Sequence, residues 1–258
     1  MVKLKKYSAG LKYFVLFLTF ATLSCKTAHR QLTRIEGREI PVEASYGTSA
    51  AVEQLIKPYR EKVESDMNTV LAYAPETLDK TGLWQTPMGN MFADVALVYG
   101  NRIFKKRENR SIDIVLLNHG GIRSIIPKGN ITTRTAFEIM PFENSMVVCT
   151  MSAATVREMV NYIIVEKKPH PLSGLTFTID QNGLAQNIMI QGNAIQDGKT
   201  YYVGTNDYLY NGGDNMTFFK NSGVKYDLDY KLRNILIDYF TDVDTVSPQN
   251  DVRIKVER

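Results

Sequence analysis

The sequence has little cysteine and histidine, two residue types that are common in metal sites and nucleophilic triads. Its 258 residues include two cysteines and three histidines. His29, His119 and His170 lie far apart in the chain, and none stands in the ligand spacing of a zinc site. No motif assembles serine, cysteine and histidine into a nucleophilic triad. We therefore expect this chain to hold no metal, no cofactor and no catalytic residue of its own.

The scarcity of cysteine also limits what can hold the fold together. Cys25 directly follows an N-terminal apolar run, whereas Cys149 lies in "MVVCTM", a pattern that predicts a buried strand. If Cys25 carries a lipid, Cys149 has no partner for a disulfide. The sequence then predicts stability from a buried apolar core alone.

Outside residues 1–24, the sequence has no excess of charge of either sign. The whole chain has 31 Lys and Arg against 27 Asp and Glu. Residues 1–24 contain four of the lysines and no acidic residue, so the remainder carries 27 residues of each sign. A formally neutral chain gives no electrostatic reason to expect a nucleic-acid partner.

The N-terminus has the pattern of an export signal. Four lysines precede the apolar run "YFVLFLTFATL", which is too short to span a bilayer as a helix, and Cys25 follows. The pattern resembles a bacterial lipoprotein signal, although Thr22 stands where leucine is usual. We expect a signal peptide over 1–24, lipid on Cys25, a tether over 25–48 and anchoring of the exported protein to the bacterial cell envelope, on its periplasmic or surface face. An uncleaved signal anchor and plain secretion are the alternatives.

Residues 49–258 mix helical and strand patterns within one domain. Apolar spacing predicts a helix over 49–74, with a kink or an extended early segment at Pro58, and β-branched residues over 112–118 predict a buried strand. The mixture of helices with hairpin-linked strands predicts an α/β (mixed α+β) fold with its sheet shielded by helices. Further helices are predicted over 88–104, 153–168 and 230–243, a short strand with a helical turn over 130–140, and strands over 145–152, 174–180, 185–192, 199–207 and 251–256.

The loop that follows the buried strand reads "VLLNHGGIRSI" over residues 115–125. Glycines at 120 and 121 would let the backbone take positive φ and bring N–H groups close to a ligand. Arg123 offers a planar fork of donors that suits phosphate. The same residues also make an ordinary turn, so the motif alone leaves both interpretations open.

Three segments together resemble a known family. "WQTPMGNMFADVAL", "LLNHGGIRSIIPKGNITTRTAFEIMPFENSMVV" and "TNDYLYNGGDNM" follow one another in the order and approximate spacing of the C-terminal, substrate-binding domain of the 5'-nucleotidase family. The resemblance covers about residues 49 to 258 and implies the fold of that domain, with mixed sheets shielded by helices. It also implies that the ligand is a nucleotide or nucleoside.

The resemblance assigns a role to each motif residue. Asn118 and Arg123 match the phosphate contacts of an Asn-x-Gly-Gly-Ile-Arg loop. Phe142 and Tyr208 match two aromatics that stack on the base, the second usually being phenylalanine. Asn144 matches a contact at the edge of the base, and Asp214 an acid that accepts from ribose hydroxyls. The substrate-binding residues so predicted are Asn118, Gly120, Gly121, Arg123, Phe142, Asn144, Tyr208 and Asp214.

Local sequence allows plainer interpretations of three of these residues. Phe142 after a proline is compatible with a core position, Tyr208 with the edge of a strand, and Asp214 after "NGG" with an ordinary turn. Only their occurrence together with the Asn-x-Gly-Gly-Ile-Arg loop favours a ligand site.

The chain departs from the family ahead of its "QTPMGN" segment. Members generally carry an arginine there, whereas this chain has "DKTGLWQTPMGN" with Trp84 as a core residue or an extra stacking surface. Lys80 is a substitute only as a point charge, without the bidentate fork of arginine. We therefore expect base and ribose to contribute more to binding than phosphate.

The second departure concerns catalysis. In a full 5'-nucleotidase the metals lie in a separate metallophosphoesterase domain, and no segment of this sequence resembles it. The resemblance thus implies a lipid-anchored recognition domain of a split 5'-nucleotidase, with divalent metals in a separately encoded metallophosphoesterase. The alternative is a surface protein that binds nucleosides or nucleotides without catalysis. A third hypothesis is an interaction or structural lipoprotein whose pocket has decayed.

Overall fold

A computed structural model of the protein describes residues 10–18, 34–248 and 250–257. The chain divides into two units, Met1–Val52 and Glu53–Arg258. In the first unit, residues 10–18 are helical and exposed, and a 3-10 turn, η1 (Ala44–Tyr46), follows. Helix α2 (Ala50–Met67) begins at the end of this unit, and most of it belongs to the second. None of the helices in the described ranges is long and apolar enough to cross a membrane. Cys25 and the predicted cleavage site lie outside the described residues.

A mixed five-stranded sheet forms the centre of the second unit, with strand order β10-β4-β9-β2-β5. Only its β2–β9 pair is parallel. A four-stranded sheet has the order β11-β6-β7-β8, and β1 pairs with β3 in a third. The strands are β1 (Val70–Ala74), β2 (Ile114–Leu116), β3 (Gly129–Thr132), β4 (Ser145–Ser152), β5 (Leu172–Ser173), β6 (Leu175–Ile179), β7 (Ala185–Ile190), β8 (Asn193–Ala194), β9 (Thr200–Asn206), β10 (Lys225–Lys231) and β11 (Ile254–Val256).

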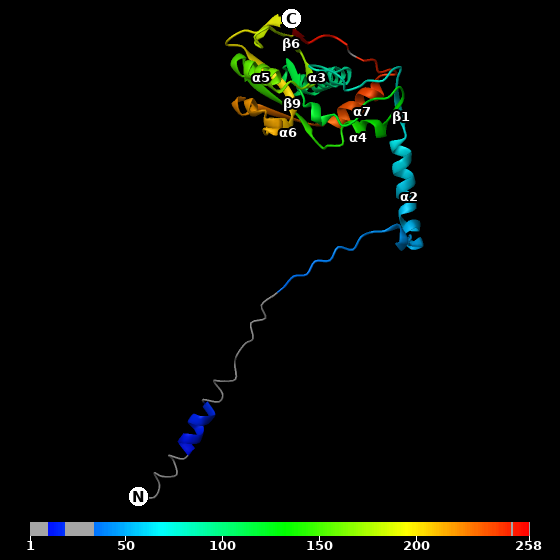
Figure 1. Ribbon diagram of the computed structural model, residues 1–258, viewed down its shortest axis with the longest axis vertical. Helices are drawn as coiled ribbons and strands as arrows, with labels where there is room; N and C mark the ends of the chain where they lie inside the picture. Colours follow the sequence, from blue (N-terminus) through cyan, green and yellow to red (C-terminus); the bar gives the residue numbers. More distant parts are fainter. Residues whose placement is uncertain (1–9, 19–33, 249, 258) are drawn as a thin grey trace. The chain divides into compact units, whose positions relative to one another are not determined.

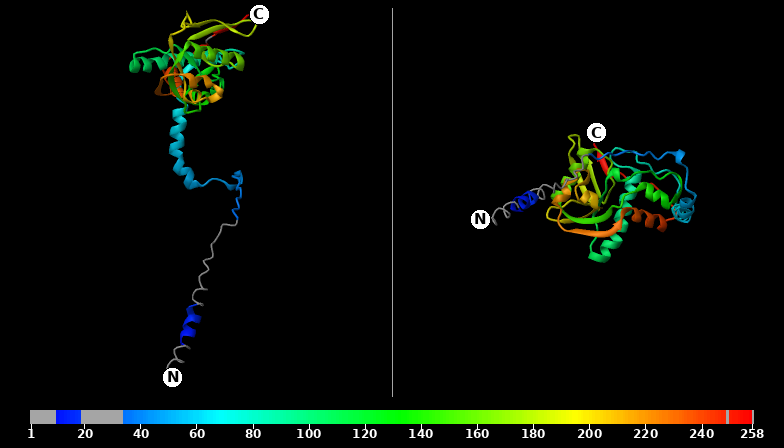
Figure 2. Two further views of the ribbon diagram at one scale, coloured as in Figure 1. Left: turned by 90° about the vertical axis from the view of Figure 1, so that its left-hand side faces the viewer. Right: turned by 90° about the horizontal axis from the view of Figure 1, so that it is seen from below.

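Helices cover both faces of the five-stranded sheet (Figure 1). In Figure 1, α3, α4 and α7 lie to one side of β9, and α5 and α6 lie to the other. Figure 2 shows β11 beside the hairpin of β6 and β7. The other helices of this unit are α3 (Pro87–Glu108), α4 (Thr133–Ile139), α5 (Ala153–Glu166), α6 (Asp207–Tyr210) and α7 (Leu232–Asp242), with 3-10 turns η2 (His119–Gly121), η3 (Gly213–Asn215) and η4 (Thr217–Asn221).

Two apolar cores lie on opposite faces of this sheet. Strand alternation divides β4 between them, because Met146 and Val148 join the core under α3 and α7, whereas Cys149 and Met151 join the core under α5. Burial of Cys149 raises the pKa of its thiol to about 12. The predicted α/β fold with mixed sheets shielded by helices is therefore confirmed, as is the buried position of Cys149.

The predicted helix over 49–74 is wrong at its C-terminal end. Helix α2 ends at Met67, and residues 70–74 form β1, which pairs with β3 and so satisfies its backbone groups in a sheet. The helix continues through Pro58, so no extended segment occurs there. No residue of α2, all of which is described, is buried. Helical spacing thus predicted the helix but not that residues 70–74 pair with β3.

The "QTPMGN" segment begins α3 and closes tightly on its neighbours. The Thr86 side chain accepts a hydrogen bond from the N–H of Gly89 at 2.9 Å, and Pro87 takes the first helical turn, where its missing N–H costs nothing. A Cβ on Gly89 would lie 2.9 Å from Thr86 Oγ1 and 3.7 Å from Pro171 Cα. Only glycine fits this approach without displacing a neighbour.

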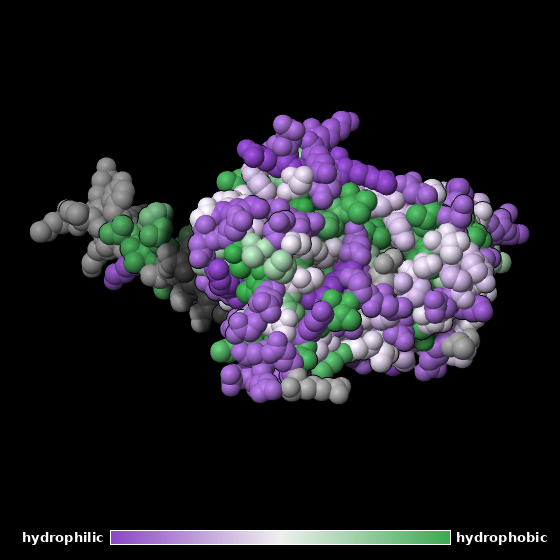
Figure 3. Space-filling view, turned by 90° about the horizontal axis from the view of Figure 1, so that it is seen from above, coloured by the Kyte–Doolittle hydropathy of each residue, from purple (hydrophilic) through white to green (hydrophobic). Residues whose placement is uncertain are grey.

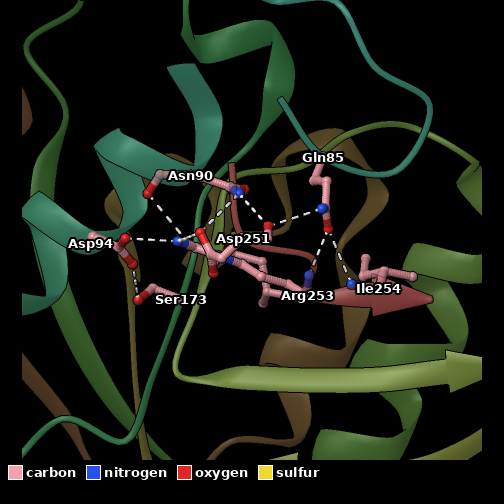
Figure 4. A network of polar contacts seen from close by, with 8 residues as sticks. Gln85, Asn90, Asp94, Ser173, Asp251, Arg253 and Ile254 are labelled. Carbon is pink, nitrogen blue, oxygen red and sulfur yellow. Dashed lines mark hydrogen bonds and ion pairs between the residues drawn. The ribbon is translucent and has the colours of Figure 1, made fainter. Parts of the chain in front are cut away.

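Arg253 fastens the C-terminal strand to the start of α3 (Figure 4). Its side chain is 6% exposed, donates to Asp94 Oδ2 at 2.6 Å and to Asp251 Oδ2 at 2.9 Å, and also donates to the carbonyl of Leu172. Asp94 also accepts from the Ser173 hydroxyl at 2.6 Å. The guanidinium is therefore paired on several sides.

Two motif side chains complete this cluster. Gln85 Oε1 accepts from the backbone N–H groups of Arg253 and Ile254 at 2.8 and 3.1 Å. Asn90 Nδ2 donates to the Asp251 carbonyl at 3.0 Å. Gln85 and Asn90 thus hold the C-terminal segment.

On the face shown in Figure 3, polar and apolar residues are interspersed.

Candidate functional site

The structure brings all eight predicted substrate-binding residues together around one cavity. Its volume is about 380 Å³. The residues come from the loop after β2, the segment before β4, helix α6 and the turn η3. Their roles toward a ligand stay predictions. The cavity is lined by Asn118, Gly120, Gly121, Arg123, Phe142, Asn144, Tyr208 and Asp214.

The loop after β2 folds tightly on Asn118. This residue is 7% exposed, and its carbonyl accepts from the Gly121 N–H at 3.0 Å. A Cβ on Gly121 would lie 2.8 Å from Asn118 Oδ1, so any other residue there would displace the Asn118 side chain. The expected reason was different and is wrong, because neither Gly120 nor Gly121 has positive φ. Close approach of backbone to side chain, rather than a left-handed conformation, selects the glycine at 121.

Arg123 has an exposed guanidinium with few protein partners. Its backbone N–H donates to the Ile139 carbonyl at 2.8 Å, which fixes the main chain. Its side chain donates to the Gly120 carbonyl at 3.3 Å and lies 6.0 Å from the centre of the Phe142 ring. No ion pair within the described ranges joins Arg123 to a carboxylate. Most of its donors are therefore available for an anion in the cavity.

Lys80 lies behind the same loop. Its ammonium donates to the Ile122 carbonyl, and burial followed by the charge of Arg123 lowers the pKa of Lys80. Burial and then the charge of Lys80 lower the pKa of His119. Lys80 therefore adds positive potential near Arg123, although it is not among the residues that line the cavity.

Two exposed aromatic rings line the cavity. Phe142 is 41% exposed and Tyr208 is 46% exposed, values that are high for large apolar side chains. Phe142 is thus not a core residue. Tyr208 lies in α6 rather than on the edge of a strand. The half-buried Asn144 is fixed through its carbonyl, which accepts from the Leu232 N–H at 3.0 Å.

Asp214 is held by two tyrosines. The Tyr208 hydroxyl donates to Asp214 Oδ1 at 2.9 Å and lies 3.2 Å from the N–H of Asp214, which donates to it. The Tyr162 hydroxyl donates to the carbonyl of Asp214 at 2.6 Å. Asp214 has φ 50°, a left-handed conformation that aspartate and asparagine adopt more readily than most other residues with a side chain. Its three hydrogen bonds to tyrosines constrain it more than an ordinary turn residue.

Sequence reasoning missed three residues that support the site. Asn206 caps α6 by accepting from the Leu209 N–H at 2.8 Å, and it donates to Asn118 Oδ1 at 3.5 Å. The pattern Asn-Asp at the start of a helix could have revealed this cap. His170 accepts from the His119 N–H at 3.3 Å through Nδ1, and Tyr162 reaches Asp214 from α5. No local signal joins these two to the cavity, because their partners lie about fifty residues away in the chain.

His170 is buried in its neutral form behind the loop. It is 3% exposed, and burial lowers its pKa to about 4. Nδ1 is the acceptor for the His119 N–H, so Nε2 carries the proton, and that atom has no partner among the described residues. The ring lies 5.8 Å from that of Tyr162. His170 thus connects the backbone of the loop to the tyrosine that holds Asp214.

Trp84 lies away from the cavity. Its half-buried ring packs against the core under α5, and it is not among the lining residues. The core interpretation of Trp84 therefore holds, and the tryptophan leaves the cavity open.

In the part of the chain that the structure describes, the side chains that commonly bind metals do not gather in one place. Within the described ranges, no group of three or more His, Cys, Asp or Glu side chains could hold a metal ion.

Comparison with known proteins identifies a family and several relatives of this chain. Residues 69–221 match the model of the family described as 5'-nucleotidase, C-terminal domain. The trifunctional nucleotide phosphoesterase protein YfkN of Bacillus subtilis is 24% identical over 235 residues, which cover 84% of this chain and 16% of that protein. The 5'-nucleotidase of Vibrio vulnificus is 24% identical over 190 residues, which cover 69% of this chain and 32% of the enzyme. The chain thus spans a third or less of the length of these two relatives.

A solved structure shares the fold. The 5'-nucleotidase precursor of Thermus thermophilus superposes with a TM-score of 0.65 at 24% identity, covering 80% of this chain and 43% of that one.

Proposed function

The chain belongs to the family of 5'-nucleotidase C-terminal domains, and from that premise we propose that it recognises a nucleotide or nucleoside for a split 5'-nucleotidase. In this proposal a metallophosphoesterase on another polypeptide hydrolyses the phosphate monoester. The observation that carries the proposal is that two exposed aromatic rings, a carboxylate and an arginine without a carboxylate partner among the described residues line the same cavity.

The aromatic rings suit a flat, apolar ligand face. Phe142 and Tyr208 come from different elements, yet both line the cavity and keep more than two fifths of their surface exposed. Stacking between an aromatic side chain and a base contributes about 1–3 kcal/mol per base. We assign the base of the ligand to the space between these rings, with the Asn144 side chain at its edge.

Asp214 suits the hydroxyl groups of a ribose. Its carboxylate lies beside Tyr208 and accepts from that hydroxyl through Oδ1 only. A carboxylate bound to a sugar hydroxyl discriminates against the deoxy sugar, because the lost donor leaves a desolvated acceptor without a partner. We therefore assign ribose recognition to Asp214.

The loop after β2 suits the phosphate. Arg123 supplies a planar fork, and Asn118 presents a buried amide already oriented by Asn206. Lys80 raises the positive potential behind the loop, but its ammonium is bonded to the Ile122 carbonyl. With one arginine in the cavity, we expect base and ribose to contribute more binding free energy than phosphate.

The proposal assigns the hydrolytic chemistry to the partner enzyme. Metal ions there would generate the nucleophile at neutral pH and neutralise developing charge. This chain would bind the nucleotide and orient its phosphate through Asn118 and Arg123, which converts binding free energy into correct placement of the reacting group.

A reconstitution assay tests the split enzyme. Release of phosphate from AMP is measured with manganese present for the purified chain, for a purified metallophosphoesterase that lacks a C-terminal domain of this family, and for the mixture. We expect nucleotide-selective hydrolysis only in the mixture, with most of the gain lost in the Arg123→Ala variant. Metal-dependent hydrolysis by this chain alone, lost on Arg123→Ala, would refute the split. Nucleotide binding without any gain in the mixture would favour the non-catalytic alternative.

We also propose export and lipid anchoring through Cys25. The lysine-rich start and the short apolar run before Cys25 support this. Membrane fractionation of cells that express wild type or Cys25→Ser tests it, with the wild type expected in the membrane fraction and the variant in the soluble one. An intact N-terminus in the mass spectrum of the wild-type protein would contradict it.

A further inference from the structure

We propose that Tyr208 and Tyr162 are positioning residues that set the selectivity of the cavity for ribose hydroxyls by holding Asp214 in place. The inference rests on the proposed function, because it assumes that Asp214 meets a sugar. It assigns Tyr208 a second role besides that of its ring, and it brings Tyr162, which does not line the cavity, into ligand recognition.

The segment that carries Asp214 requires external support. Gly212 and Gly213 precede it, and Gly212 has φ 92°. Asp214 and Asn215 are both in the left-handed region, with φ of 50° and 58°. Left-handed residues other than glycine persist when the surrounding contacts specify them. An exposed carboxylate on such a turn would otherwise adopt several orientations, which would weaken any preference between similar sugars.

The tyrosines bond three different groups of Asp214. The Tyr208 hydroxyl accepts a hydrogen bond from the Asp214 backbone N–H at 3.2 Å and donates one to Asp214 Oδ1 at 2.9 Å. The hydroxyl therefore bridges the main chain and the side chain of Asp214. The Tyr162 hydroxyl donates to the carbonyl at 2.6 Å. The main chain and the carboxylate of Asp214 are therefore both fixed, each by a group on another helix.

Each tyrosine is itself held by packing. The ring of Tyr162 packs against those of His170 and Phe218, with ring centres at 5.8 and 5.5 Å. A Cβ on Gly213 would lie 2.4 Å from the ring of Tyr208, so the glycine turn is pressed against that ring. The hydroxyls thus act as fixed points rather than as mobile donors.

This arrangement leaves one carboxylate oxygen for a ligand. Oδ1 accepts from Tyr208, and no donor among the described residues bonds Oδ2. A sugar hydroxyl that donates to an oriented Oδ2 gains a hydrogen bond to a charged acceptor without the cost of ordering it. Removal of either tyrosine hydroxyl should therefore reduce the preference for ribose while it leaves the base contacts unchanged.

Tyr208→Phe and Tyr162→Phe test the inference, because each removes one hydroxyl and keeps its ring. Tyr210→Phe is the matched control, since Tyr210 lies in the same helix as Tyr208 and its ring packs on Phe219 with centres 6.5 Å apart. Titration calorimetry with adenosine, 2'-deoxyadenosine and 9-methyladenine measures the ribose preference and the affinity for the base alone.

We expect each test variant to reduce the ratio of adenosine to 2'-deoxyadenosine affinity by roughly three- to tenfold. The affinity for 9-methyladenine should stay within about twofold, and Tyr210→Phe should leave both quantities unchanged. An unchanged ratio in Tyr208→Phe would overturn the inference, as would an equal loss of affinity for all three ligands. If Tyr162→Phe fails to fold, Tyr208→Phe decides alone, because its hydroxyl lies at the exposed end of the pair.

A measurement without ligand separates this inference from the proposed function. Hydrogen exchange of the Asp214 amide, followed by NMR, should be faster in Tyr208→Phe than in wild type and unchanged in Tyr210→Phe, since only the first loses the acceptor. Equal exchange in all three proteins would show that the tyrosine does not hold Asp214. Wild type that binds no adenosine would instead refute the proposed function and, with it, the assumed role of Asp214.

Discussion

Arg253 and Arg123 show two opposite uses of one side chain. Arg253 is buried and donates to two carboxylates and to two backbone carbonyls. Arg123 is exposed and makes one side-chain hydrogen bond, at 3.3 Å, to the carbonyl of Gly120. Both belong to the same domain and both have the same five donors. The difference is that the protein provides acceptors for the Arg253 guanidinium but leaves most donors of the Arg123 guanidinium without an acceptor among the described residues.

The comparison gives a physical criterion for the candidate site. A guanidinium whose donors are satisfied by the protein holds elements together, and a ligand would have to displace existing bonds to reach it. A guanidinium that lines an open cavity without a carboxylate partner can bind an anion without that cost. Stability should therefore depend on Arg253, and ligand binding on the cavity that contains Arg123.

The largest effect should come from the Arg253 cluster. Arg253→Ala should lower the free energy of unfolding by about 2–4 kcal/mol, because Asp94 and Asp251 lose their shared cation. This loss is smaller than the roughly 3–5 kcal/mol of a fully buried pair, since both carboxylates are partly exposed. Urea denaturation of Arg253→Ala beside Arg123→Ala measures the difference. A similar loss of stability in both variants would break the comparison.

The next effect concerns His170, which is buried without a charged partner among the described residues. Its folded pKa of about 4 lies below the usual 6.5, so protons bind the unfolded chain more tightly. Its contribution is complete above about pH 6.5 and is lost as the pH falls toward 4, up to roughly 3 kcal/mol. Denaturation curves between pH 7 and 4 should show this slope, and His170→Asn should flatten it. A slope unaffected by that substitution would place its origin elsewhere.

A smaller effect is expected at the aromatic wall. Phe142→Ala should weaken adenosine binding by about 1–3 kcal/mol, because it removes one stacking face. Phe142→Tyr keeps the ring and serves as the control. Since Phe142 is 41% exposed, the stability of either variant should change little, unlike that of Arg253→Ala. Unchanged adenosine affinity in Phe142→Ala would remove this residue from the site.

The smallest effect is a change of selectivity at Asp214. Asp214→Asn keeps the size of the side chain but removes the charge that makes the sugar contact strong. The difference in binding free energy between adenosine and 2'-deoxyadenosine, measured by titration calorimetry, should fall by about 1–1.5 kcal/mol, at least as much as in Tyr208→Phe. A ratio identical to that of wild type would assign the sugar contact to another group.

The resemblance of three motifs to the 5'-nucleotidase family predicted which residues line the cavity. The loop after β2, the "MPFEN" segment and "YLYNGGD", taken together in their order, named all eight of them, although local sequence alone left plainer interpretations open. The reason given for Gly121 was incorrect, because close packing against Asn118 is a property of the folded loop that no sequence spacing reveals.

Contacts between distant segments could not be predicted in this way. Arg253 meets Asp94 across 159 positions, and Tyr162 meets Asp214 across 52. The apolar face of α2 predicted a helix, but the same pattern continued into residues 70–74, where pairing with β3 makes a strand instead. In each case, contacts between segments far apart in the chain determine the structure, and the local sequence does not reveal them.

Titration of wild type and Arg123→Ala with adenosine and AMP tests the central claim most directly. We predict that wild type binds both ligands, that AMP binds somewhat more tightly, and that Arg123→Ala binds adenosine as wild type does but loses the gain from the phosphate. Failure of wild type to bind either ligand, or an equal loss of adenosine and AMP binding in Arg123→Ala, would contradict the account.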